Sequence, residues 1–294
     1  MRIGFIGLGS MGTPMARNLV RNGFAVAGFD TNPAALTTLG GNGGRPASSA
    51  AEAAREADAL VLMVVNAAQA EAVLFEAGAL SAMAPSGVVL LMATCPPGAV
   101  AALAARVSAA GRGFVDCPVS GGTAGADAAT LTIMAAVAPE TFDRVRPVLD
   151  ALGDKVFHVG AEPGQGAVVK TVNQLLCGVH IAAAAEGLAL AAKVGVDPDV
   201  ILRILGKSSA ASWMLNDRGP RMLQADPPVS SAVDIFVKDL GIVLEAGRDA
   251  KAALPLAAAA HQLFLASSGR GDGAADDSQV IRSYALLNGS RRLE

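Results

Sequence analysis

Several polar side chains interrupt a largely apolar segment of the sequence. Residues 164–192, GQGAVVKTVNQLLCGVHIAAAAEGLALAA, carry Lys170, Asn173, Gln174 and His180. An ammonium group among apolar side chains loses hydration at a cost of several kcal/mol, unless it finds partners or releases its proton. Its pKa then falls toward neutrality, where a lysine can act as a general acid or base. The segment predicts a proton-transfer site at Lys170; a snorkelling lysine is the alternative.

The apolar pattern around this lysine predicts a helix that starts at Lys170. The helical repeat of about 100° per residue puts four side chains within roughly a third of a turn of the lysine: Asn173, Gln174, Cys177 and His180. On this face His180 could bind a substrate, or it could be a core histidine with an internal partner. The apolar surroundings of Cys177 are more typical of packing than of reactivity.

A second motif, GLGSMG, places Gly7, Gly9 and Gly12 in GxGxxG spacing. It follows an apolar run of strand length and opens a helical pattern. In that context the glycines can make a tight turn, admit a pyrophosphate against the backbone and let the helix pack on the strand. The helix N-terminus supplies N–H groups for the phosphates. We therefore expect a dinucleotide to bind Gly7, Leu8, Gly9, Met11 and Gly12.

Asp30 ends the next apolar run, AVAGFD. In dinucleotide-binding domains an acidic residue about 20 residues after the glycines accepts hydrogen bonds from the ribose 2′-OH and repels a 2′-phosphate. No arginine follows in DTNPA. Asp30, with its neighbours Thr31 and Asn32, therefore predicts NAD rather than NADP. The alternative, that the glycines only turn the chain, does not explain why strand, helix and acid are in register.

The elements that must position these residues alternate up to residue 160. The expected strands are RIGFIG, AVAGFD, ADALVLMVV, GVVLLMA, GFVDCPV, TLTIMAAVA and KVFHVG, with helical patterns between them, including 97–110 and 139–152. This order predicts βαβ units and a parallel sheet. From Pro163 onward the patterns are helical only. We predict an α/β chain with a Rossmann-type dinucleotide-binding domain over residues 1–161 and an all-α domain over 162–294, with the boundary helix lining a cleft.

Composition favours small-molecule partners. The 294 residues are 52% hydrophobic and 17% charged, with a net charge of -3. The sequence therefore lacks the basic patch expected for binding nucleic acid or an anionic membrane surface. Residues 175–192 are apolar but rich in alanine, and they include His180 and Glu186, which favours a buried helix over a membrane span.

Cysteine spacing and the chain start predict a cytoplasmic protein. Cys95, Cys117 and Cys177 are far apart and form no CxxC motif, which is typical of a reducing compartment. The apolar run after Arg2 is too short for a signal peptide. A metal is not expected, because the three histidines show no HxxxH or ExxH spacing and a lysine can supply the proton chemistry. His158 and His261 are expected to be structural.

Four motifs together resemble the β-hydroxyacid dehydrogenase family, which contains 3-hydroxyisobutyrate dehydrogenase and tartronate semialdehyde reductase. GLGSMG resembles the cofactor loop, DCPVSGG the substrate segment, GQGAVVKTVN the catalytic segment and VKDL a late cofactor-closing segment. The resemblance covers the whole chain. It implies an NAD-dependent oxidoreductase that converts a short hydroxy acid to its oxo acid.

The resemblance also implies roles for matching residues. Lys170 would be the general acid/base, and Asn173 would hold the substrate hydroxyl or carboxylate. Ser120, Gly121 and Gly122 would bind the substrate carboxylate through hydroxyl and N–H groups. Further matches would contact the cofactor: Met63, Val64 and Val65 on the adenosine side, Thr94 near the nicotinamide, and Lys238, which Asp239 would orient. Departures from the family pattern include Ala93, Cys117, Ala129 and Ala136. None removes a reacting group, and they concern local geometry around the strand that ends near Val137.

Later segments resemble the L-threonate dehydrogenase branch: GVHIAAAAE, SSAVDIFVKDLGIVLEAG and AAAAHQLFLASSGRGDGAADDS. This resemblance implies oxidation of L-threonate to 2-oxo-tetronate, and Gln174 and His180 could supply the extra hydrogen bonds that a polyhydroxy acid needs. SSGRGDGAADD itself is expected to be a solvated loop.

Other functions remain open. The chain could be a 3-hydroxyisobutyrate dehydrogenase, a tartronate semialdehyde (2-hydroxy-3-oxopropionate) reductase, or a non-catalytic dinucleotide-binding sensor. The presence of Lys170 with Asn173 disfavours the sensor. It also disfavours an imine-reducing relative, in which a different acid would occupy the position of Lys170. The apolar second domain predicts a homodimer or homotetramer.

Overall fold

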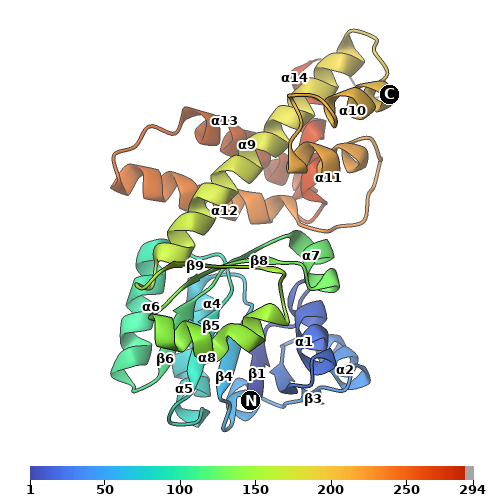
Figure 1. Ribbon diagram of the computed structural model, residues 1–294. Coiled ribbons are helices and arrows are strands. Elements are labelled where there is room, and N and C mark those ends of the chain that lie inside the picture. The colour runs from blue at the N-terminus through green and yellow to red at the C-terminus, as the bar shows by residue number, and fades with distance from the viewer. Residues whose placement is uncertain (289–294) are drawn as a thin grey trace. The chain divides into compact units, whose positions relative to one another are not determined.

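The computed structural model describes residues 1–288 and has the predicted fold class, a Rossmann-type α/β part followed by helices (Figure 1). The chain forms two compact units, Met1–Lys170 and Thr171–Glu294. The division falls within helix α9 (Gln165–Lys193), after the boundary at residue 161 that the sequence predicts. The first turn of α9 is therefore part of unit 1.

Unit 1 contains one sheet, with strand order β3-β2-β1-β4-β5-β6-β8-β7 and β9 paired with β8. Its strands are rich in the β-branched and other apolar residues that favour buried strands. They are β1 (Arg2–Ile6), β2 (Ala25–Phe29), β3 (Arg45–Pro46), β4 (Ala59–Leu62), β5 (Val88–Leu91), β6 (Gly113–Asp116), β7 (Val119–Ser120), β8 (Thr132–Ala136) and β9 (Lys155–Gly160).

The expected parallel sheet is confirmed for β1 to β6 and is wrong for the next strands. All neighbours from β3 to β6 are parallel, whereas β8 runs antiparallel to β6 and β7 and parallel to β9. A strand can run parallel to the preceding strand only if a crossover connection returns the chain to the edge of the sheet where the preceding strand began. The short helix α7 (Gly122–Ala128) makes no such return and instead packs against α1 (Gly12–Arg21).

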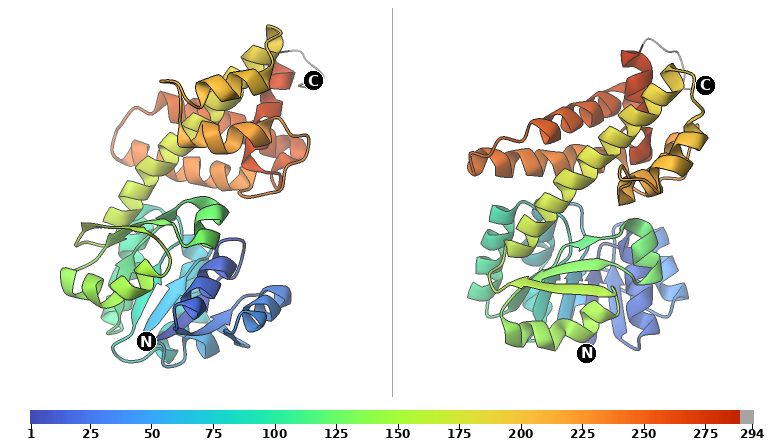
Figure 2. Two further views of the ribbon diagram at one scale, coloured as in Figure 1. Left: turned by 45° about the vertical axis from the view of Figure 1, so that its right-hand side comes forward. Right: turned by 45° about the horizontal axis from the view of Figure 1, so that its top comes forward.

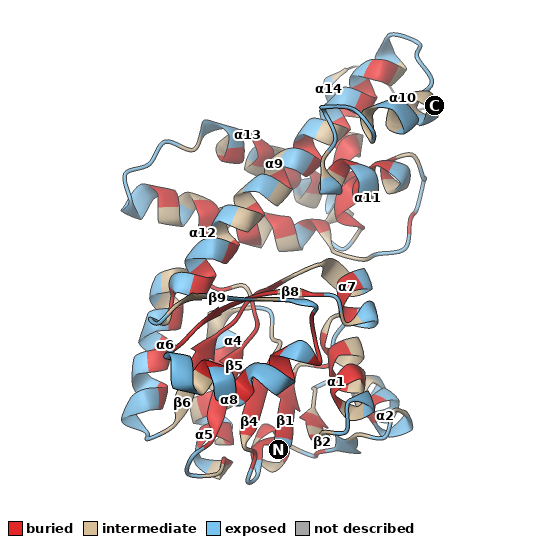
Figure 3. Cartoon of the chain, viewed as in Figure 1, coloured by how far each residue is buried: buried red, intermediate tan, exposed pale blue. Residues whose placement is uncertain are grey.

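Helices cover both faces of this sheet. Side chains alternate along each strand, so Phe5 and Val61 enter one core whereas Ile6 and Leu62 enter the other. The first core is closed by α1, α2 (Pro33–Gly41) and α8 (Pro139–Asp150); the second by α3 (Ala50–Ala54), α4 (Ala67–Glu71), η1 (Ala72–Glu76), α5 (Ala79–Ala82) and α6 (Pro97–Ala109). The central strands are buried on both sides (Figure 3), which explains their nearly continuous apolar sequence.

Unit 2 is helical, coloured yellow through red in Figure 2. Beyond α9 it contains α10 (Pro198–Leu205), α11 (Trp213–Met222), α12 (Val233–Asp249), α13 (Pro255–Ser267), η2 (Ser268–Asp272), η3 (Asp277–Ile281) and α14 (Arg282–Leu287). Its core includes Ile181 from α9, and Phe236 and Phe264, whose rings stack with centroids 5.1 Å apart. No strand follows β9 in the described part of the chain; Ala232 and Asp276 form an isolated bridge.

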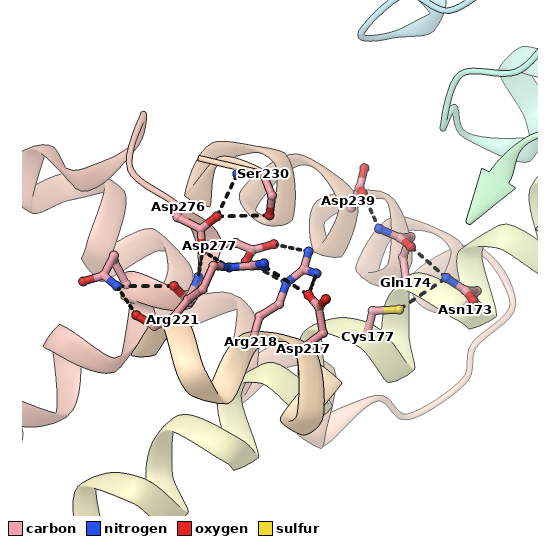
Figure 4. Close-up of polar contacts among 12 residues, drawn as sticks. Asn173, Gln174, Cys177, Asp217, Arg218, Arg221, Ser230, Asp239, Asp276 and Asp277 are labelled. Atoms are coloured by element: carbon pink, nitrogen blue, oxygen red, sulfur yellow. Dashed lines mark hydrogen bonds and ion pairs between the residues drawn. The ribbon is translucent and has the colours of Figure 1, made fainter. Parts of the chain in front are cut away.

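The expectation of a solvated loop at SSGRGDGAADD is wrong in part: Ser267 is buried at the end of α13, Ser268–Asp272 form η2, and the last two residues are buried. Asp276 and Asp277 are 1% and 0% exposed. Arg218 donates to both carboxylate oxygens of Asp277 at 3.0 and 2.9 Å, and Arg221 Nε donates to Asp276 Oδ1 at 3.1 Å (Figure 4). Buried carboxylates need such partners. Both arginines come from α11, which is distant in sequence.

Helix α9 is long and apolar enough to span a bilayer by length and composition, with a mean hydropathy of 1.8 over an 18-residue window. Half of that window is buried inside the protein, and buried core helices meet the same criteria. Burial in a core therefore accounts for its composition, as the alanine content and Glu186 predict.

Candidate active site

The residues predicted to bind the cofactor lie after the carboxyl ends of neighbouring parallel strands. Gly7 follows β1, Asp30 follows β2, Met63 follows β4, and Thr94 comes shortly after β5. Strand β1 has β2 on one side and β4 on the other, so the strand order reverses there. In open α/β sheets, ligands bind outside the carboxyl ends at such a switch point.

The glycine loop has a space for a ligand at one glycine only. Gly7 has φ +93°, and a Cβ on Gly7 or Gly12 would collide with backbone, from Met63 and Gly7 respectively. At Gly9, by contrast, a Cβ would meet nothing within 4 Å. Helix α1 starts after Met11 without a side-chain cap. In its first turn the Thr13 and Met15 N–H groups donate to the carbonyls of Gly9 and Met11, so a phosphate here would be held mainly by the positive end of the helix dipole and by the N–H groups of the preceding loop. The loop fits a dinucleotide.

Asp30 links this loop to the end of β2. Its Oδ2 accepts a hydrogen bond from the Leu8 N–H and its Oδ1 accepts one from the Asn32 N–H, both at 2.7 Å. Asn32 in turn caps α2 by accepting from the Ala34 N–H at 3.0 Å. Thr31 and Asn32 are exposed. The carboxylate is thus held in a fixed orientation beside the loop.

A pocket of about 820 Å³ adjoins the loop and the start of α2. This volume lies in the range of small-molecule sites, about 300–1,000 Å³. It is lined by Leu8, Gly9, Ser10, Thr13, Pro14, Arg17, Asn32, Ala34, Ala35, Thr38, Asn42, Thr123, Ala124 and Asp127. Ser10 and Thr13 were not among the residues predicted to bind the cofactor. The hydroxyl of Thr13 donates to the Leu8 carbonyl at 2.5 Å, a hydrogen bond that restrains the glycine loop.

The other predicted cofactor contacts of unit 1 occupy loops at the same sheet edge. The Met63 N–H donates to the Ile6 carbonyl at 2.9 Å. Val64 is partly buried, and Val65 is 50% exposed with its N–H donating to Gln69 Oε1. Thr94 is partly buried.

The predicted substrate segment begins where β6 ends. Ser120 lies in β7 and is partly buried. Gly121 and Gly122 have φ +132° and +61°, values that L side chains rarely adopt. A Cβ on Gly122 would meet nothing within 4 Å, so the backbone of this turn can be approached closely.

Lys170 lies in the second turn of α9 rather than at its start, because the helix begins at Gln165. The residue is only 7% exposed, which excludes the snorkelling alternative. The helix begins early because Asp116 Oδ2 accepts hydrogen bonds from the N–H groups of Gly164 and Ala167, both at 2.9 Å.

Asp116 was not singled out from the sequence. It is 1% exposed. Burial raises the pKa of Asp116 to about 6, against the opposing effect of the N–H groups of Ala167, Gly164 and Gly166. Only its place at the start of DCPVSGG could have drawn attention to it.

A chain of polar contacts in unit 2 includes five residues singled out from the sequence. Asn173 Nδ2 donates to Gln174 Oε1 at 2.9 Å and contacts Cys177 Sγ at 3.3 Å (Figure 4). Gln174 Nε2 donates to Asp239 Oδ2 at 2.5 Å. Asp239 Oδ1 also pairs with Lys238 Nζ at 2.7 Å, a contact through which Asp239 could orient Lys238, as expected from the sequence. The contact of Lys238 with the cofactor stays a prediction.

The histidines have separate environments. His180 is exposed, so the core-histidine alternative is wrong. His158 Nε2 lies 2.7 Å from the Val137 carbonyl oxygen and its ring stacks on Phe142, and His261 Nε2 lies 3.1 Å from the Val237 carbonyl oxygen. These contacts confirm their structural role.

Neither disulfides nor clustered metal ligands occur within residues 1–288. The cysteines at positions 95 and 117 are buried and the one at 177 is partly buried, and none forms a disulfide. No group of three or more His, Cys, Asp or Glu side chains is placed to hold a metal ion among these residues.

Two family models match the chain. Residues 2–160 match the NAD binding domain of 6-phosphogluconate dehydrogenase, and residues 164–284 match the NAD-binding domain of NADP-dependent 3-hydroxyisobutyrate dehydrogenase. Together they cover both the glycine loop and the lysine helix.

Individual relatives match over nearly the full length. The L-threonate dehydrogenase of Cupriavidus necator is 47% identical over 283 residues, covering 96% of this chain and 95% of the relative. That of Escherichia coli K12 is 40% identical over 96% of this chain and 94% of the relative. The crystal structure of 3-hydroxyisobutyrate dehydrogenase from Salmonella typhimurium is 41% identical, has a TM-score of 0.91, and is matched over 96% of this chain and 99% of that one. The predicted resemblance is confirmed: the chain belongs to the 3-hydroxyisobutyrate dehydrogenase family of NAD(P)-dependent hydroxyacid dehydrogenases.

Proposed function

We propose that this protein oxidises L-threonate to 2-oxo-tetronate with NAD as the hydride acceptor and Lys170 as the general base. The observation that carries the substrate assignment is the identity of 47% to an L-threonate dehydrogenase over nearly the whole of both chains. Four further relatives of that name are 39–40% identical over 96% of this chain. The 3-hydroxyisobutyrate dehydrogenase of Pseudomonas aeruginosa is 36% identical over 89%.

In this reaction Lys170 accepts the proton of the substrate hydroxyl at Nζ. Its burial supports this role, because a side chain that is only 7% exposed can exchange a proton with a bound substrate away from bulk water. When bound, the cofactor supplies the nicotinamide ring that takes the hydride from the substrate carbon bearing that hydroxyl. Asn173, one turn further along α9, holds the substrate hydroxyl or carboxylate.

The substrate carboxylate is bound by the turn at Ser120, Gly121 and Gly122. The glycine φ values and the open space at Gly122 support close approach of an anion to backbone N–H groups. Gln174 orients Asn173, since its carbonyl oxygen accepts from the Asn173 amide while its own amide donates to Asp239.

A direct role for His180 in substrate binding stays a prediction. His180 follows Lys170 by ten residues on the same helix, which corresponds to about 15 Å along the axis. A four-carbon acid held at Lys170 is shorter than that. The helical rise therefore favours Gln174 over His180 as the residue that distinguishes polyhydroxy acids.

The preference for NAD over NADP rests on Asp30. Both oxygens of its carboxylate are fixed by backbone N–H groups, so it cannot swing away from a 2′-phosphate. Like charges in close contact are disfavoured. We assign the remaining cofactor contacts to Met63, Val64, Val65, Thr94 and Lys238.

We further propose a homodimer or homotetramer located in the cytoplasm. One face of α9 carries Val172, Leu176 and Leu190, and Val194 directly follows the end of the helix; these four side chains are 49–65% exposed. A Cβ on Gly187, between the two pairs, would meet nothing within 4 Å, so another helix can approach closely. Exposed apolar stripes of this kind are typical of interfaces between identical subunits.

The first test is turnover of purified protein, followed by the near-ultraviolet absorbance of the reduced cofactor. The substrates are L-threonate, D-threonate, D-erythronate, D-glycerate and 3-hydroxyisobutyrate, each with NAD and with NADP. We expect the highest kcat/KM for L-threonate with NAD. Faster turnover of glycerate or hydroxyisobutyrate would overturn the threonate assignment but not the role of Lys170; no turnover across the panel would support a non-catalytic sensor.

The same assay tests the cofactor assignment. Asp30→Ala should raise kcat/KM for NADP relative to NAD by about tenfold or more, the equivalent of roughly 1.4 kcal/mol. An unchanged ratio would show that Asp30 does not face the ribose.

A further inference from the structure

We propose that Asp116 is a positioning residue that fixes the first turn of α9, and with it Lys170, against the segment that binds the substrate carboxylate. The inference rests on the proposed function for the identity of the base. In this role Asp116 contacts neither substrate nor cofactor and instead positions Lys170 through the helix.

The first observation is the direct connection between β6 and α9. Asp116 is the last residue of β6, and its Oδ2 accepts from the N–H groups of both Gly164 and Ala167 at 2.9 Å. A negative charge at a helix N-terminus is stabilised by the unsatisfied N–H groups and by the helix dipole. A single oxygen therefore holds the start of a 29-residue helix.

The second observation is the packing at Gly166. A Cβ there would lie 2.5 Å from the Met134 carbonyl oxygen, 2.8 Å from the Asp116 carbonyl oxygen and 3.0 Å from Asp116 Oδ2. Glycine inside a helix normally costs about 1 kcal/mol relative to alanine. Here glycine is required, because it lets the helix backbone lie directly against β6 and β8.

The third observation concerns the hydrogen bonds from the Gly164 and Ala167 N–H groups to Asp116, which we call the clamp. The clamp lies close in sequence to the proposed reacting groups. Lys170 follows Ala167 by three residues in the same helix, a rise of about 4.5 Å. In the other direction, Ser120 follows Asp116 by four residues, and the Pro118 carbonyl accepts from the Met134 N–H at 3.1 Å. Asp116 therefore joins the segment proposed to bind the carboxylate to the helix proposed to supply the base.

This arrangement matters for rate because reacting groups must meet in a narrow range of distances. A misplacement of about 1 Å can reduce turnover about 100-fold. Loss of the clamp frees the first turn of α9 and displaces Lys170 Nζ from the substrate hydroxyl. Cofactor binding at the glycine loop does not depend on it.

The test compares Asp116→Ala with Asp116→Asn, whose amide oxygen can still accept both N–H groups. Val145→Ala is the matched control, because Val145 is fully buried in the same unit, on α8, and has no role in the proposed site. The readouts are kcat and KM for the best substrate, the dissociation constant for NAD, and hydrogen exchange of the amides of residues 164–170.

We expect Asp116→Ala to lower kcat by about 100-fold, to leave the NAD dissociation constant unchanged and to accelerate exchange at 164–170. Asp116→Asn should keep kcat within about fivefold of wild type. Its amide oxygen still accepts both hydrogen bonds, and only the negative charge of the acceptor is lost. Val145→Ala should lower stability without changing either kcat or this exchange.

Two results would overturn the inference. One is a kcat and an exchange rate in Asp116→Ala that match those of Val145→Ala. The other is a loss in Asp116→Asn as large as in Asp116→Ala, which would mean that the charge itself acts in the reaction. If Asp116→Ala does not fold, Gly166→Ala replaces it: it should lower kcat at least tenfold although alanine favours helices, and normal kcat would contradict the clamp.

The hydrogen-exchange readout requires no substrate. Wild-type protein that does not turn over L-threonate would therefore contradict the proposed function alone, while unchanged exchange at 164–170 in Asp116→Ala would contradict the clamp alone.

Discussion

Gly12 packs so closely against Gly7 that a Cβ atom on Gly12 would collide with the carbonyl oxygen of Gly7. Gly9, between them in the same motif, faces open space. The three glycines of one motif are thus required for two different reasons.

This difference predicts that alanine at Gly12 lowers stability, whereas alanine at Gly9 weakens NAD binding. Gly12→Ala should lower the free energy of unfolding by about 1–3 kcal/mol, because the backbone must move to admit the methyl group. Gly9→Ala should change it by less than about 0.5 kcal/mol but weaken NAD binding, because the methyl group occupies the space of the pyrophosphate. Urea unfolding and calorimetric titration with NAD separate the two effects; equal losses of stability would contradict this division of roles.

Lys170→Met should lower kcat by about 10²–10⁴-fold, the usual contribution of a general base, with little change in the dissociation constant for NAD. Methionine preserves the length and the buried, apolar stem of the side chain. Lys207→Met, at an exposed position of unit 2, is the control and should leave kcat unchanged. Near-normal turnover in Lys170→Met would rule out the mechanism.

Stability should depend on pH through Asp116. Its pKa is raised from an ordinary value of 3.8 to about 6, mainly by burial, so between these values the folded protein binds a proton that the unfolded chain does not. The contribution of Asp116 to the free energy of unfolding should therefore rise as the pH falls from about 7 to about 4, by up to about 3 kcal/mol. Glu52 and Asp276, whose pKa values are lowered, act in the opposite direction in both proteins. The quantity to measure by urea unfolding is therefore the difference in the free energy of unfolding between wild type and Asp116→Asn, which should shift in favour of wild type as the pH falls. Parallel pH curves would mean that Asp116 does not titrate there.

The buried ion pair between Arg218 and Asp277 should be costly to break from one side. Arg218→Met leaves the carboxylate of Asp277, 0% exposed, without its bidentate partner, and should destabilise the protein by about 3–5 kcal/mol. Replacing Asp277 by leucine in the same variant should recover part of the loss, because no charge is then left buried. A double variant less stable than Arg218→Met would show that the carboxylate is held by its other neighbours.

The apolar stripe on α9 should control assembly. Leu190→Glu places a charge where a second subunit is proposed to pack and should shift the protein to a smaller species in sedimentation velocity. The control is Glu245→Gln on α12, a polar change outside the stripe, which should leave the sedimentation coefficient as in wild type. An unchanged sedimentation coefficient in Leu190→Glu would exclude this face as the interface.

Features encoded by neighbouring residues were predictable from the sequence. The glycine spacing, the run ending at Asp30 and the apolar strands β1, β2 and β5 depend on local patterns, and each occurs where the pattern indicates. The two-residue strand β3 was missed, because two residues show no periodicity, and β7 was merged with β6 in the expected strand GFVDCPV. The reversed direction of β8 also depends on where α7 packs, which no local pattern reveals.

Buried charges were the least predictable part of the candidate site and of unit 2. Asp116 and Asp277 look like ordinary surface carboxylates in sequence, since their partners lie 48 or more residues away in the chain. Only the folded chain brings the N–H groups of α9 to the first and the guanidinium of Arg218 to the second. Lys170 was recognised because its neighbours in sequence are apolar, so its burial could be inferred locally.

Helix α9 also limits how the chain length can vary. It continues without interruption from Gln165 to Lys193. Inserting one residue between Lys170 and Asn173 would turn every later side chain of the helix by about 100° and advance it by about 1.5 Å. The base would then face one way and its neighbouring amide another. Insertions are better absorbed in the exposed turn at 207–211, so length changes should be tolerated there and excluded from the helix.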